Sequence, residues 1–117
     1  MKITLDNTIL NNIRELQTDG EENFLNELIE LYKLDSSQTV QKIEKCVKQK
    51  DFQGVKRAAH NLKGSSANLG GSELAVFCRE LEVSAENEDA KGLINLLPQL
   101  EQIYQETVVE LEKQKKP

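Results

Sequence analysis

The chain has 117 residues, of which 38% are hydrophobic and 30% charged, and its formal net charge is −5 at pH 7. This length suits one domain, residues 1–117, with a single core. Nucleic acids and anionic membranes attract basic surfaces, so the negative balance argues against both as main partners. No apolar run is long enough to cross a membrane, and the N-terminus lacks the apolar segment of a signal peptide. We therefore expect a cytoplasmic protein without direct membrane contact.

The composition favours helices. Aromatic residues make up only 4% of the chain, tryptophan is absent, and there are two prolines and six glycines. No stretch alternates apolar and polar residues as a half-buried strand would. The two cysteines, Cys46 and Cys78, fall on apolar helical faces, which predicts buried, reduced thiols.

Two helices are predicted in the first half of the chain. The first spans about 6–17, with Asp6 as its N-cap, and turn-forming residues follow at 18–20. Its apolar stripe is Ile9, Leu10, Ile13 and Leu16. The second helix spans about 21–49 and is polar in its middle, where Asp35 falls on the apolar side and predicts a bend or a solvent-facing stretch. Its apolar side holds Phe24, Leu28, Leu31, Tyr32, Ile43 and Cys46.

Three more helices follow. Asp51 caps a helix over about 52–69, which the glycines at 70 and 71 end. Ser72 is the predicted N-cap of the next helix, which fades at 86–89. The last helix starts at about 90 or 92 and ends at 113, and Pro98 within it predicts a kink or a late start. Residues 114–117 form a polar tail that we expect to be frayed.

The expected fold is all-α. Four long amphipathic helices with short connections, over about 21–113, predict an antiparallel up-down-up-down four-helix bundle. The short helix at 6–17 would cover one end. No stripe shows a second exposed apolar face, so we expect a monomer.

The candidate site centres on His60, the only histidine. On a helical wheel it lies about 130° from the centre of the apolar face, so the imidazole should face solvent. The core face consists of Phe52, Val55, Ala59, Leu62, Ser66 and Leu69. The helical neighbours of His60 are Lys56, Arg57, Lys63, Gly64 and Ala67.

This pattern suits an imidazole that carries a phosphoryl group. Lys63, three residues on, is close enough to stabilise the anion, and Gly64 leaves space for a donor protein. A solvated surface histidine beside ordinary cations would look similar. The glycine, which costs about 1 kcal/mol in a helix, is explained equally well by close helix packing.

Residues 60–70, HNLKGSSANLG, resemble the H-x-x-K-G-x-S-x-x-x-G signature of histidine-containing phosphotransfer (HPt) domains. The segments LDN at 5–7, FLNELIELY at 24–32, DFQGVKRAAH at 51–60 and LAVFCRELE at 74–82 are also similar to this family. The resemblance implies that His60 is phosphorylated, that Lys63 steadies the phosphoryl group and that Gly64 admits a partner. Glu82 stands where the family often has a glutamine that orients the imidazole, and a carboxylate could also hold the ring.

The resemblance further implies a phosphocarrier of a two-component multistep phosphorelay. Its partners would be receiver domains of response regulators and a hybrid sensor histidine kinase, and Lys56, Arg57, Gly64 and Ala67 would lie at the docking surface. No nucleotide-binding motif is present, so we expect no kinase activity of its own and no cofactor, with Mg²⁺ in the partner receiver. One alternative is a non-phosphorylated helical adaptor that docks a receiver or another signalling protein. Another is a small enzyme with His60 as general base, for which no second catalytic group is visible.

Overall fold

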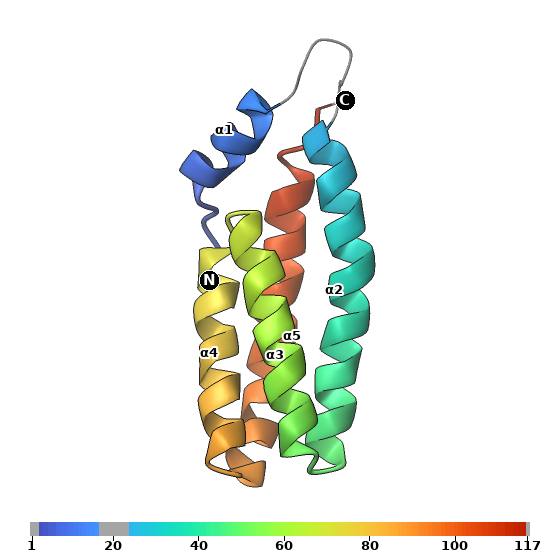
Figure 1. Ribbon diagram of the computed structural model, residues 1–117, viewed down its shortest axis with the longest axis vertical. Helices are drawn as coiled ribbons and strands as arrows, with labels where there is room; N and C mark the ends of the chain where they lie inside the picture. The colour runs from blue at the N-terminus through green and yellow to red at the C-terminus, as the bar shows by residue number, and fades with distance from the viewer. Residues whose placement is uncertain (1–2, 17–23, 117) are drawn as a thin grey trace.

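The computed structural model describes residues 3–16 and 24–116, and within them the chain is helical without strands. Figure 1 shows the long helices side by side and a short helix near their upper end. The helices are α1 (Asn7–Glu15), α2 (Phe24–Lys48), α3 (Phe52–Asn68), α4 (Ser72–Glu86) and α5 (Ala90–Glu112).

The long helices form the predicted antiparallel bundle. They run alternately down and up, so that α2 packs on α3, α3 on α4, α4 on α5, and α5 back on α2. The bundle is elongated, with extents of 49 × 25 × 19 Å. The short helix α1 lies near the connection between α3 and α4 (Figure 1). The predicted turn at 18–20 and the predicted helix start at 21 lie outside the described residues.

The core consists of side chains at helical spacing on the inward face of each helix, including Leu10, Ile29, Ile43, Leu62, Leu74, Leu81, Leu93, Leu100 and Leu111. Both cysteines are buried and free, as predicted. Two stripe assignments are wrong, because Leu16 and Leu31 are 68% and 60% exposed. Each lies at the edge of its apolar stripe, where spacing alone does not reveal whether a neighbouring helix covers the side chain.

The ends of the helices agree with the sequence prediction except at the N-cap of α4. The carboxylates of Asp6, Asp51 and Asp89 accept hydrogen bonds from backbone amides in the first turns of α1, α3 and α5. The N-cap of α4 is Gly71 rather than Ser72, and no side chain caps that helix. The Gly71 carbonyl accepts the first hydrogen bond of α4, from the Ala75 amide at 3.0 Å, so Ser72 is already the first helical residue.

Two stretches where the sequence left the continuity of a helix open are helical in the described chain. The helix α2 runs through its polar middle with Asp35 exposed, so this stretch faces solvent within one helix. A buried serine, Ser36, occupies the next position and hydrogen-bonds the Tyr104 hydroxyl at 2.8 Å. The helix α5 begins at Ala90 and continues past Pro98, so a late start at that proline is wrong.

Both ends of the described chain are attached to the bundle. The Asp6 amide donates to Gly70 O at 2.8 Å, and Gly70 has a φ of 81°. A Cβ there would lie 2.8 Å from Asp6 O, so only glycine permits this approach. The tail predicted to be frayed is held through residue 116, because Asn26 exchanges two hydrogen bonds with the Lys116 backbone, at 2.9 and 3.1 Å.

Candidate functional site

His60 lies in the middle of α3, on the side away from the core. The inward face of this helix buries Val55, Ala59, Leu62 and Ser66. That burial fixes the rotation of the helix about its axis and leaves the His60 side chain 72% exposed, as its position on the helical wheel predicts. The imidazole is therefore accessible to a second protein.

The imidazole has one close acidic neighbour, Glu82 on α4. Its Oε2 lies 3.6 Å from His60 Nδ1, longer than a hydrogen bond but close enough to become one after a small movement. The Glu82 side chain is only 6% exposed, because it points into the seam between α3 and α4. Glu82, which the family resemblance singled out, thus lies beside His60 in space although it is 22 residues further along the chain.

Two cations offset the buried charge of Glu82. Lys63 Nζ lies 2.8 Å from its Oε1, and Arg79 Nη1 lies 3.8 Å from its Oε2. Oε1 accepts no aligned hydrogen bond from a described residue, so the contact with Lys63 is an ion pair. Sequence reasoning missed Arg79, although its position three residues before Glu82 on a helix could have indicated the contact.

Gly64 follows His60 by about one turn and faces open space. A Cβ added at this glycine would meet no atom within 4 Å. Close packing between helices therefore does not explain the glycine, which removes one of the two interpretations that the sequence left open. Among the described residues, none occupies the space that a Cβ at position 64 would fill beside His60.

The other predicted docking residues lie around this centre but not all in contact with it. Lys56 is paired with Glu86 of α4 at 3.0 Å, and a hydrogen bond from this lysine lowers the pKa of the Glu86 carboxyl. Arg57 lies on the opposite flank, in a polar groove of about 520 Å³ between α2 and α3. Ala67 is half-buried near the end of α3. The site is thus a strip along α3 bordered by α2 and α4.

The inward side of α3 is held by buried polar groups. Ser66 faces the core, as predicted, and its Oγ lies 2.8 Å from the Tyr32 hydroxyl of α2. Burial raises the pKa of Tyr32 to about 12, against a smaller opposing effect of the bond to Ser66. Burial also raises the pKa of the Cys78 thiol to about 12, with a further rise from the Glu82 carboxylate. Both groups are therefore neutral at physiological pH.

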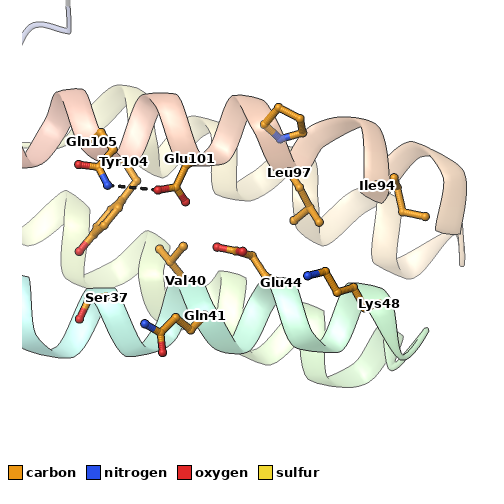
Figure 2. Close-up of a pocket in the computed structure, with 11 residues that line it drawn as sticks. Ser37, Val40, Gln41, Glu44, Lys48, Ile94, Leu97, Glu101, Tyr104 and Gln105 are labelled. Atoms are coloured by element: carbon orange, nitrogen blue, oxygen red, sulfur yellow. Dashed lines mark hydrogen bonds between the residues drawn. The ribbon is translucent and has the colours of Figure 1, made fainter.

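A second groove, of about 690 Å³, lies between α2 and α5 (Figure 2). Val40 and Leu97 provide apolar surface there, while Glu44 and Lys48 lie at its α2 side. None of the residues that line it belongs to α3 or α4, so it is separate from the His60 strip. The candidate functional surface is therefore an exposed helix face rather than a cavity.

Within residues 3–16 and 24–116, we find no cluster of three or more histidine, cysteine, aspartate or glutamate side chains able to hold a metal ion. In the same part of the chain, no helix combines the length and the apolar character that a membrane crossing requires.

An antiparallel four-helix bundle with an exposed histidine beside a basic residue and an unfilled glycine is the arrangement that the resemblance to histidine phosphotransfer domains implies. A family profile described as the Hpt domain matches residues 27–110. The match covers most of the chain, so this protein belongs to the Hpt domain family.

Known proteins agree with this assignment. The chain is 29% identical over 90 residues to histidine-containing phosphotransfer protein 4 of Arabidopsis thaliana, covering 75% of this chain and 71% of that protein. It is 24% identical over 95 residues to multistep phosphorelay regulator 1 of Schizosaccharomyces pombe, covering 81% of this chain but only 32% of that protein. The crystal structure of histidine-containing phosphotransfer protein B from Pseudomonas aeruginosa PAO1 superimposes with a TM-score of 0.83 at 27% identity, covering 93% of this chain and 91% of that one.

Proposed function

We propose that this chain is a phosphocarrier of a multistep phosphorelay, which accepts a phosphoryl group on His60 from one receiver-domain aspartate and passes it to another. The observation that carries the proposal is the exposed imidazole, 72% accessible, with its Nδ1 side turned toward the buried Glu82. Membership in the Hpt domain family supports the same role.

The chemistry needs a neutral imidazole with a free lone pair. With the Nδ1 proton directed toward Glu82, the lone pair is on Nε2, the ring nitrogen farther from the carboxylate. This lone pair attacks the phosphorus of the aspartyl phosphate. A nitrogen–phosphorus bond forms, and the phosphorus–oxygen bond to the aspartate breaks, with its electrons leaving on the carboxylate. Transfer to the next receiver is the same exchange in reverse.

The docking surface follows from what lies around the imidazole. Gly64 leaves an open approach to His60, and Lys63 brings a cation near the phosphoryl oxygens. Leu31 of α2 is exposed, and the next residue, Tyr32, bonds Ser66 of α3. Because Ser66 lies about 9 Å along the axis of α3 from His60, Leu31 lies at about the same distance along the bundle. A receiver that covers this strip would bury the leucine. We expect weak, fast-exchanging binding, because a relay must release each partner.

The phosphoryl group comes from outside this chain, which has no kinase activity of its own and uses no cofactor. The Mg²⁺ of the transfer reaction lies in the acidic pocket of the receiver. A hybrid sensor histidine kinase is the upstream source of the phosphoryl group. The protein acts in the cytoplasm as a monomer, without nucleic acid or membrane as a partner.

The test is phosphotransfer from a panel of pre-phosphorylated receiver domains to the wild type and to His60→Gln. We expect label on the wild type only, lost in acid and kept in base, as a phosphorus–nitrogen bond requires. Because His60 is an exposed side chain, the variant should fold and still bind receivers. Binding of a receiver to both proteins with transfer to neither would instead support the adaptor function.

A further inference from the structure

Glu82 is a charged group in a place where a neutral one would hold the ring equally well. An amide of the same length could accept a hydrogen bond from His60 Nδ1, so orientation of the imidazole does not require a carboxylate. The carboxylate is 6% exposed, and burial of a charge is costly unless cations compensate it. The negative charge itself therefore needs an explanation.

The charge changes what Lys63 can do. Its Nζ lies 2.8 Å from Glu82 Oε1, and its side chain is 30% exposed. Because this ion pair offsets part of the positive charge of Lys63, the lysine attracts any other anion less strongly. A phosphoryl group on His60 would thus compete with Glu82 for the same ammonium group.

Phosphorylation on Nε2 also adds negative phosphoryl oxygens on the side of the ring away from Glu82, while the ring keeps its Nδ1 proton facing the carboxylate. Glu82 Oε2, which lies 3.6 Å from Nδ1, still repels these oxygens across the ring by Coulomb interaction. Because Glu82 lies in a protein seam, solvent screens the repulsion less than it would at a fully exposed position. Arg79, 3.8 Å from Oε2 and 59% exposed, compensates this repulsion only in part.

We infer that the charge of Glu82 sets the direction of transfer: it destabilises the phosphorylated carrier and shifts the equilibrium toward the phosphorylated receiver. This inference rests on the proposed function. In this role Glu82 is a positioning residue that acts through Lys63 and through its own field, while the bond-making atom belongs to His60. A carrier of this design would pass its phosphoryl group on rather than store it.

The test is the equilibrium constant between phosphorylated receiver and phosphorylated carrier, obtained from the forward and reverse transfer rates. We expect Glu82→Gln to shift this constant about tenfold toward the carrier, the effect of one unit charge a few ångströms away in a partly exposed site. Glu82→Asp, which keeps the charge, should stay near the wild type. The matched control is Glu86→Gln, which removes an exposed carboxylate one turn further along α4 and should leave the constant within about twofold.

The inference is overturned if Glu82→Gln slows transfer equally in both directions, because an unchanged constant means that the side chain only orients the ring. Should no receiver label the wild type, phosphoramidate can phosphorylate His60 with release of ammonia. At a fixed ratio of phosphoramidate to ammonia, the labelled fraction reports the same charge effect. Absence of transfer from receivers would then count against the proposed function, whereas equal labelling of wild type and Glu82→Gln would count against the inference.

Discussion

Gly64 allows protein stability and phosphotransfer to be changed in opposite directions. A Cβ at this position meets no atom within 4 Å, so Gly64→Ala places a methyl group in open space. Alanine is favoured over glycine in a helix interior by about 1 kcal/mol, because glycine loses more backbone freedom on folding. The free energy of unfolding should therefore rise by about this amount.

The same change can be expressed as a melting temperature. Unfolding entropy of roughly 2.1 cal/mol/K per residue, over 117 residues, gives about 0.25 kcal/mol/K, so Gly64→Ala should raise the Tm by about 4 °C. Gly64→Gln, with a weaker helix former, should gain about half as much stability. Urea unfolding followed by circular dichroism measures the free energy directly.

Phosphotransfer should respond in the opposite direction. If Gly64 exists to admit a receiver, each added atom obstructs docking, so the transfer rate should fall for Gly64→Ala and by at least about tenfold for Gly64→Gln, a loss of roughly 1.4 kcal/mol in the transition state. The control is Gly70→Ala, where a φ of 81° and the Asp6 backbone at 2.8 Å predict destabilisation instead. A stabilised Gly64→Gln protein that transfers at the wild-type rate would refute the docking argument.

Three further outcomes follow from other parts of the fold. Burial raises the pKa of Tyr32 from 10.0 to about 12, so the unfolded chain releases this proton at a lower pH than the folded one. The free energy of unfolding should therefore fall between pH 10 and about 12. Urea titrations across that range measure this fall, and Tyr32→Phe should give a flatter profile. Lys50 follows α2 with a φ of 56°, so Lys50→Gly should raise the free energy of unfolding by up to about 1 kcal/mol in urea, and a loss of stability would contradict this. Cys78 is fully buried with a pKa raised to about 12, so iodoacetamide should label it only in denaturant, and rapid labelling of the native protein would show that the core opens there.

Helical periodicity was sufficient to predict the bundle and the outward direction of His60, because both depend on the angular position of residues around a helix. It was insufficient for Leu31, whose exposure depends on how closely α3 approaches α2. The N-cap of α4 was also misassigned, since a serine next to two glycines resembles a cap in sequence. Only the structure shows that the Gly71 carbonyl accepts the first helical hydrogen bond of α4, from the Ala75 amide at 3.0 Å, which makes Gly71 the cap.

The candidate site could be predicted in part. The signature at 60–70 identifies His60, Lys63 and Gly64, and the similarity of α4 to the family identifies Glu82. Spacing along α3 does not show that the ammonium of Lys63 is paired with Glu82, because that contact joins two helices. Lys50 and Glu88 are left-handed at helix ends like Gly70, but neither is a glycine, so the sequence carries no signal for their backbone conformation.

The buried hydroxyl pair of Tyr32 and Ser66 has a consequence for how α3 can move. An all-apolar interface allows one helix to slide along another at little cost, since leucine contacts can be replaced by similar ones. A slip of one turn, about 5.4 Å, would separate these two hydroxyls and leave both without their partner in the core. The pair thus fixes the register of α3 against α2, and this sets how far along α2 the exposed imidazole of His60 lies.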